Sequence, residues 1–197
     1  MRSLLSRIHQ GECNSRLGVK SSARNVILLL LSLAVLPAGA TTGRSAIDVE
    51  RGAVFLYQPD APLRARLESA QDLTAHIKRL QAAGTAFFAS ERTHEKLDVV
   101  VGVKPGKKVR VWLISSRRSS ADKTLVLLRR KLEAIPPCTV HEGPVAFALV
   151  WTINGTPAEI EAMPPCPIPK EWRDAAAGKN IQVPKVLDGV LARVWKD

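Results

Sequence analysis

The sequence predicts an α+β fold, in which a small antiparallel sheet has helices packed on it. Residues 97–114 alternate in hydrophobicity around Lys104-Pro105-Gly106-Lys107, which is typical of a β-hairpin. Residues 145–153 alternate in the same way and end at Asn154-Gly155, a strong hairpin signal. Segments with apolar residues every three or four positions precede and follow the first hairpin. The predicted core order is therefore helix, strand, strand, helix, strand.

The predicted domain begins with a short strand at Ala53–Tyr57 and a helix that starts at Asp60. An acidic residue followed by Pro62 in the first turn is typical of a helix N-terminus. We expect one continuous helix that ends at Gly84. Its buried stripe is predicted to contain Leu63, Leu67, Ala70, Leu73, Ile77 and Leu80.

The second core helix is predicted to begin after Ser119–Asp122 and to end at Pro136-Pro137, because proline disfavours helical geometry in the preceding residue. Residues 158–162 are predicted to return as an edge strand beside residues 145–153. Two short C-terminal helices, at 170–177 and 184–195, are expected to cover the sheet. Residues 53–197 are thus predicted to form a single α+β domain.

The N-terminal region has the features of an export signal. Lys20 and Arg24 precede the apolar run Val26–Leu36, and Ala38-Gly39-Ala40 resembles a cleavage site. We expect residues 1–40 to be removed after Ala40, residues 41–52 to be flexible, and the product to be periplasmic or secreted without a stable membrane span. The long stretch before the apolar run gives the further hypothesis that translation starts at Val19.

Two cysteines, Cys138 and Cys166, follow the predicted signal, and in an oxidising compartment we expect them to form a disulfide. The alternative is a small metal or redox site made by these two residues and His141. The spacing lacks the fourth ligand of a strong zinc signature, and no C-x-x-C motif is present. We therefore predict no cofactor.

The chain is basic, with a net charge of +11, and residues 41–197 contain 24 Lys and Arg against 17 Asp and Glu. Export and an aromatic content of 5% argue against nucleic acid as the partner. We expect an envelope protein or an anionic envelope surface. The candidate surface for an anionic partner consists of Lys104, Lys107, Lys108, Arg110, Arg117 and Arg118. A further basic run, residues 129–131, lies on the second predicted helix.

No motif in the chain identifies a catalytic residue. Nucleophile-elbow, H-E-x-x-H and phosphate-loop motifs are absent from the sequence. His76 lies at the edge of the predicted apolar stripe, where a packed histidine is the usual reason for such a position. We expect no catalysis, and an unrecognised hydrolase remains an alternative.

Three segments resemble the C-terminal domain of TonB-type energy transducers. VVVGVKPGKKVRVWLISS is similar to the family's hairpin, Asp122–Leu125 with Leu128 and Leu132 to its second helix, and Gly143-Pro144-Val145 to the approach to its last strand. The resemblance covers about residues 62–153 and implies a domain whose exposed sheet edge accepts a partner strand. The chain lacks the family's proline-rich spacer and the histidine in its apolar anchor. The expectation is therefore an exported, free-standing, non-catalytic binding protein associated with the cell envelope.

Overall fold

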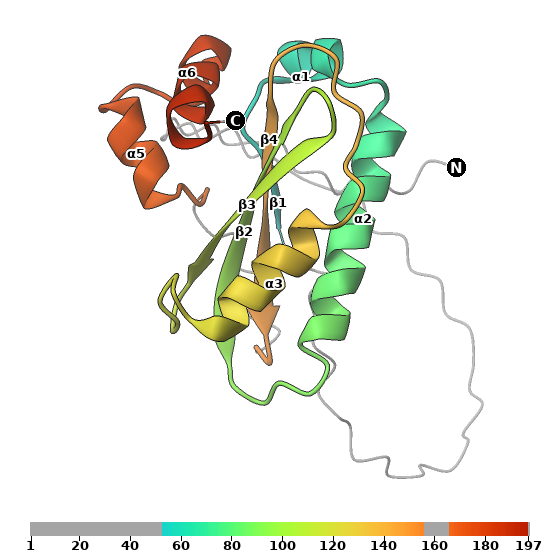
Figure 1. Ribbon diagram of the computed structural model, residues 1–197, viewed down its shortest axis with the longest axis vertical. Helices are drawn as coiled ribbons and strands as arrows, with labels where there is room; N and C mark the ends of the chain where they lie inside the picture. Colours follow the sequence, from blue (N-terminus) through green and yellow to red (C-terminus); the bar gives the residue numbers. More distant parts are fainter. Residues whose placement is uncertain (1–52, 156–165, 197) are drawn as a thin grey trace, which may run out of the picture.

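The computed structural model describes residues 53–155 and 166–196. It contains a four-stranded antiparallel sheet in the order β1-β4-β2-β3, with helices packed on it (Figure 1), so the α+β class is confirmed. The elements in chain order are β1 (Val54–Leu56), α1 (Asp60–Arg66), α2 (Ala70–Phe87), β2 (Glu95–Lys104), β3 (Lys108–Ser115), α3 (Lys123–Glu133), β4 (Val145–Ile153), α5 (Lys170–Ala176) and α6 (Pro184–Val194). The predicted signal at 1–40, the segment 41–52 and the return strand at 158–162 lie outside the described residues.

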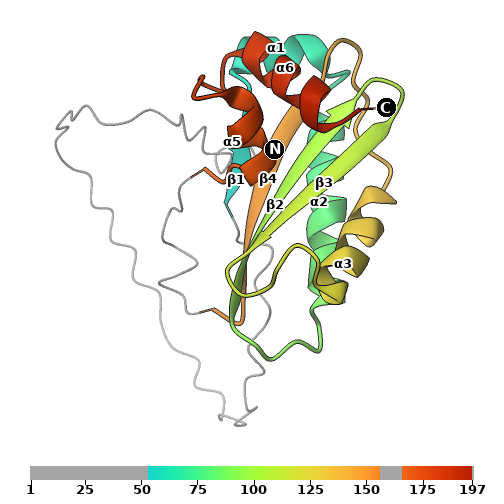
Figure 2. The ribbon, with the colours of Figure 1, turned by 60° about the vertical axis from the view of Figure 1, so that its left-hand side comes forward.

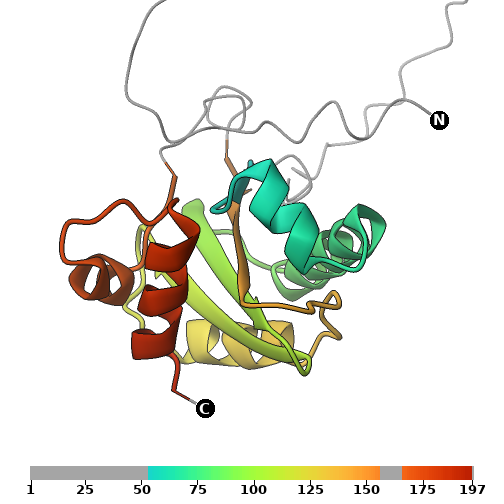
Figure 3. The same cartoon turned by 90° about the horizontal axis from the view of Figure 1, so that it is seen from above.

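The sheet lies between two layers of helices, with α2 and α3 on one face and α5 and α6 on the other (Figures 2 and 3). Alternate residues of a strand point to opposite faces, and the two cores follow this rule. Val99 and Leu149 belong to the core under α2 and α3, whereas Val100 and Ala148 belong to the core under α5 and α6. All nine residues of β4 are buried, as expected for a central strand covered on both sides.

The core under α5 and α6 is rich in aromatic side chains. Trp112 of β3 contacts both Trp172 and Trp195 edge to face, with ring centroids 5.0 and 6.3 Å apart, and Tyr57 contacts Trp172 at 5.3 Å. Such contacts bury large apolar areas. The expectation that the two C-terminal helices cover the sheet is confirmed.

The single long helix predicted from Asp60 is wrong, because the chain forms two helices, α1 and α2. Leu67 has extended backbone geometry and pairs with Val140, which interrupts the helical hydrogen bonds. Ser69 then begins α2 as its N-cap, and its Oγ accepts a hydrogen bond from the Asp72 N–H at 3.0 Å. The apolar stripe continues through both helices, so its periodicity alone does not reveal the break.

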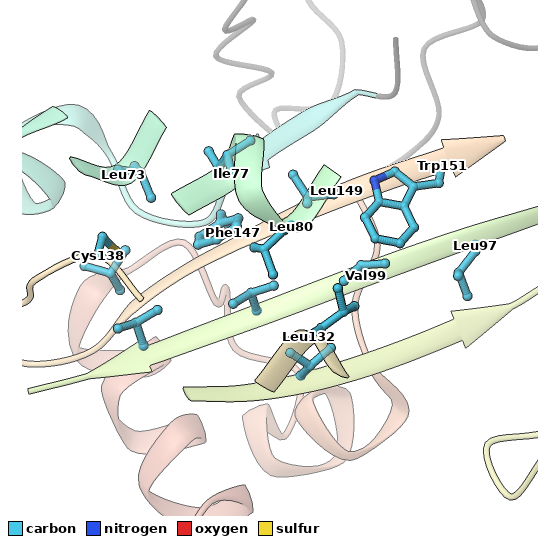
Figure 4. Packing of buried hydrophobic residues seen from close by; sticks show 14 of the residues in the cluster. Leu73, Ile77, Leu80, Leu97, Val99, Leu132, Cys138, Phe147, Leu149 and Trp151 are labelled. Carbon is cyan, nitrogen blue, oxygen red and sulfur yellow. The ribbon is translucent and has the colours of Figure 1, made fainter. Parts of the chain in front are cut away.

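Gly84 was predicted to end the helix, but α2 continues to Phe87. A Cβ atom at position 84 would lie 2.6 Å from Cη2 of the Trp151 indole. The glycine therefore allows the helix to approach β4 closely. The Trp151 side chain lies in the core beside the sheet, as Figure 4 shows.

Gly84→Ala is expected to destabilise the protein by about 1–3 kcal/mol, because the added methyl group overpacks a rigid core. The matched control is Gly189→Ala on α6, where an added Cβ meets nothing within 4 Å. This control is expected to stabilise by about 0.5–1 kcal/mol, since alanine favours the helix. Urea unfolding of both variants measures the difference, and equal effects would contradict the role given to Trp151.

Candidate binding surface at the β3 edge

β3 is at the end of the sheet, and among the described residues it pairs with β2 alone. The N–H of Val111 points away from β2 and donates to Oε1 of Glu133 on α3 at 3.0 Å. Backbone groups in antiparallel strands alternate between the two sides, so Leu113 and Ser115 share this outward direction. α3 packs on one face of the sheet next to β3 (Figure 2), and its Glu133 carboxylate occupies the middle of the edge.

Most of the excess positive charge lies in residues 104–134, which comprise the hairpin tip, β3, the following loop and α3. This segment contains ten Lys and Arg against two Asp and Glu, a net charge of +8. Residues 53–103, by contrast, contain six of each sign. We call β3 and α3, with the hairpin tip and the loop between them, the basic edge. The charge is thus concentrated in one continuous segment, around the β3 end of the sheet.

The six predicted surface residues do not all face solvent. Lys107, Lys108 and Arg117 are exposed. Lys104 is half-buried, and its Nζ donates to the Trp195 carbonyl at 2.8 Å and lies 4.6 Å from the centroid of the Trp195 ring. Arg110 is also half-buried, with its guanidinium 5.5 Å from the centroid of the Trp112 ring. Lys104 thus helps hold the C-terminal segment on the sheet, whereas Arg110 packs on a neighbour in its own strand.

Arg118, the sixth residue, points inward and joins two carboxylates. Its Nη1 lies 2.6 Å from Oε2 of Glu95, which is fully buried at the start of β2, and its Nη2 donates to Oε2 of Glu91 at 2.8 Å. The Ser115 hydroxyl donates to the other oxygen of Glu95 at 2.5 Å. The pKa of Glu91 is lowered to about 2, mainly because the Thr93 N–H donates a hydrogen bond to its carboxylate. Arg118 therefore holds the loop after β3 in place.

The outward face of α3 adds residues to the six that the sequence analysis assigned to this surface. Lys123, Leu127 and Arg130 are exposed at helical spacing, opposite the buried Leu125 and Leu128. Leu127 is 58% exposed, which is unusual for a residue in the middle of a packed helix. The sequence contains a signal for this face, because positions 127 and 130 lie between the apolar positions Leu125, Leu128 and Leu132, and position 123 precedes them at the same helical spacing.

Cys138 and Cys166 are not joined by a disulfide in the structure, contrary to the prediction. Cys138 is fully buried in the core under α2 and α3, near Leu73 and Phe147 in Figure 4. Cys166 packs against the core on the opposite face, under α5 and α6. The sheet thus separates the two side chains, and proline-rich flanks in the sequence do not reveal on which face each residue lies.

Alkylation of the unfolded protein without reductant is expected to label Cys138. In the native protein this cysteine should react very slowly, because it is buried and burial raises its thiol pKa to about 11. Peptide mass spectrometry measures the labelled fraction in native, unfolded, and unfolded-and-reduced samples. Labelling of Cys138 that appears only after reduction would restore the disulfide prediction.

The residues suggested for a metal or redox site are not brought together. His141 is exposed, and its backbone N–H donates to the Arg66 carbonyl at 2.9 Å, while the two cysteines belong to different cores. Within residues 53–155 and 166–196, no three His, Cys, Asp or Glu side chains form a group suited to a metal ion.

His76 is a packed core residue, as predicted. It is fully buried on α2, its ring contacts Phe147 edge to face at 5.7 Å, and neither ring nitrogen has a hydrogen-bond partner among the described residues. Burial, with a smaller effect of Arg79, lowers its pKa to about 4. A histidine that activates a side-chain nucleophile is hydrogen-bonded to it, and His76 has no such partner within this part of the chain.

The chain matches no protein-family model, no curated protein and no solved structure. None of the described helices is long and apolar enough to cross a membrane.

Proposed function

We propose that this chain is an exported, envelope-associated binding protein that acts by contact and not by catalysis, with the basic edge as its contact surface. The observation that carries the proposal is the net charge of +8 within residues 104–134, next to a segment of balanced charge. Charge concentrated on one surface steers a partner of opposite sign and fixes its orientation. The exposed side chains Lys107, Lys108, Arg117 and Arg130 are the first contacts.

The resemblance to the TonB C-terminal domain supports this proposal through the order of elements. Helix α2, strands β2 and β3, helix α3 and strand β4 follow one another as the resemblance implies. β3 is at the end of the sheet, as the resemblance implies, and Glu133 occupies the N–H of Val111 in the middle of its edge, so the proposed contact is made by the basic side chains and not by an added strand. Under this proposal a periplasmic location rests on the N-terminal signal features, which lie outside the described residues.

The two alternative functions have less support from the described residues. A metal or redox site would need Cys138 and Cys166 on the same face of the sheet, and they pack in different cores. A hydrolase would need a histidine paired with a nucleophile, and His76 lacks such a pairing in this part of the chain.

Site-specific photo-crosslinking tests the proposal. A photoreactive amino acid replaces Lys107 or Arg130 on the basic edge, and Lys179 or Lys185 in the C-terminal region serves as the matched exposed control. In cells that export the protein, crosslinks to an envelope component are expected from 107 and 130, and in isolated envelopes they should weaken as salt is raised. Equal crosslinking from all four positions, or none from 107 and 130, would refute the proposal.

A further inference from the structure

The outward face of α3 combines an exposed leucine with basic residues. Lys123, Leu127 and Arg130 lie three and four positions apart, so their side chains share one side of the helix. The opposite side is buried against the sheet and α2 through Leu125, Leu128 and Leu132. In a helix whose apolar side is already buried, the outward side is usually polar. Leu127 at 58% exposure departs from that pattern.

The charge of α3 is not balanced on its outward side. The helix contains four basic residues, Lys123, Arg129, Arg130 and Lys131, all of them exposed. Its acidic residue, Glu133, turns toward the sheet and accepts the Val111 N–H at 3.0 Å. Lys131 lies partly over the Phe87 ring, at 5.7 Å from its centroid. On the outward side, the exposed Leu127 is therefore surrounded by basic side chains.

These features fit a flat anionic surface better than an added strand. A strand would need the outward backbone groups of β3, but Glu133 already occupies the N–H of Val111 in the middle of the edge. The outward side of α3 offers long basic side chains and one leucine instead. Basic side chains attract anionic headgroups, while an apolar side chain enters the boundary between headgroups and acyl chains.

We propose that the outward face of α3 binds the surface of a bilayer rich in anionic phospholipids through Lys123, Leu127 and Arg130, with Arg129 exposed on the flank of that face. This inference rests on the proposed function, of which it specifies the partner. Each Lys or Arg near such a surface contributes about fivefold to membrane partitioning. Removal of three of them is therefore expected to weaken binding by roughly 100-fold.

The first experiment uses Leu127→Trp as a local reporter in the full chain. The native tryptophans Trp112, Trp151, Trp172 and Trp195 are buried, so their emission should stay nearly constant and the wild type serves as the blank. Phosphatidylglycerol vesicles are expected to shift the emission of the new tryptophan to shorter wavelength. Neutral phosphatidylcholine vesicles should cause no such shift. They are the control for membrane binding through the apolar run Val26–Leu36, which the full chain contains.

The second experiment measures vesicle co-sedimentation of two triple variants with the same charge change. Lys123→Gln, Arg129→Gln and Arg130→Gln together should lose binding to phosphatidylglycerol vesicles by roughly 100-fold. The control, with Lys170→Gln, Lys179→Gln and Lys185→Gln, should bind nearly as the wild type does. All six side chains are exposed, so both variants should keep the native circular dichroism spectrum. Equal loss in both variants would overturn the proposal.

The outcomes separate this inference from the proposed function. Suppose that Leu127→Trp does not respond to anionic vesicles while positions 107 and 130 crosslink to an envelope protein. The lipid inference is then wrong, and the proposed function stands with a protein partner. If neither the vesicle response nor the crosslinks are observed, the lipid inference and the proposed function are both refuted.

Discussion

Arg118→Met is expected to destabilise the protein by about 3–5 kcal/mol. The Arg118 guanidinium lies 2.6 Å from the Glu95 carboxylate, and Glu95 is fully buried. Without the arginine, one carboxylate oxygen of Glu95 keeps no cationic partner, and a buried unpaired charge is costly. Urea unfolding at neutral pH measures the loss.

Arg117→Met is the matched control, because the two arginines are adjacent and carry the same charge. Arg117 is exposed, and its guanidinium approaches the His94 carbonyl only at 3.5 Å. Its replacement should change the unfolding free energy by no more than about 0.5 kcal/mol. Similar effects of the two substitutions would show that the Arg118–Glu95 ion pair is not important for stability.

A double variant separates the loss of the ion pair from the loss of arginine packing. Glu95→Gln removes the carboxylate, so in Arg118→Met with Glu95→Gln no buried charge lacks its partner. The double variant should be more stable than Arg118→Met alone, because removal of both partners costs less than removal of one. A double variant that is less stable than the single one would attribute the effect to packing.

The contrast between Arg117 and Arg118 shows where sequence patterns stop being informative. Both residues belong to the same basic run, and local chemistry gives no reason to separate them. Their roles depend on Glu91 and Glu95, which the β2–β3 pairing brings near the end of β3. The exposed and the structural arginine can therefore be distinguished only when the strand register is known.

Elements defined by local periodicity were predicted closely. The bounds of β4 agree with the predicted 145–153, and the hairpin of β2 and β3 forms around the predicted turn. Such elements are determined by alternation and turn residues within one segment. The break at Leu67 depends on pairing with Val140, and the continuation of α2 past Gly84 coincides with the close approach of Trp151. Contacts between distant segments thus overrode the local pattern at both positions.

Two titratable groups, the buried His76 and the half-buried Asp98, are expected to affect stability in opposite directions below neutral pH. The first is His76, whose pKa is lowered from 6.5 to about 4, mainly by burial. The unfolded chain therefore takes up a proton at higher pH than the folded protein does. The stability associated with neutral His76 is present above pH 6.5 and is lost as the pH falls toward 4, by about 3 kcal/mol.

The second group is Asp98 on β2, whose pKa is raised from 3.8 to about 6, mainly by burial and against the opposing charge of Lys96. Its Oδ1 has no hydrogen-bond partner among the described residues. Here the folded protein holds a proton that the unfolded chain has already released. Stability therefore rises as the pH falls from about 6 to 3.8, over nearly the range in which His76 lowers it.

Single substitutions should separate these opposing effects. His76→Phe keeps an aromatic ring against Phe147 without a titrating group, so its stability relative to the wild type should improve as the pH falls from 6.5 to 4. Asp98→Asn should show the reverse, with a relative stability that worsens over the same range. Urea unfolding at several pH values measures both differences, and the comparison with wild type cancels the titration of the other carboxylates. If both differences are independent of pH, neither group titrates differently in the folded and unfolded states, and the burial of His76 and Asp98 has no electrostatic consequence for folding.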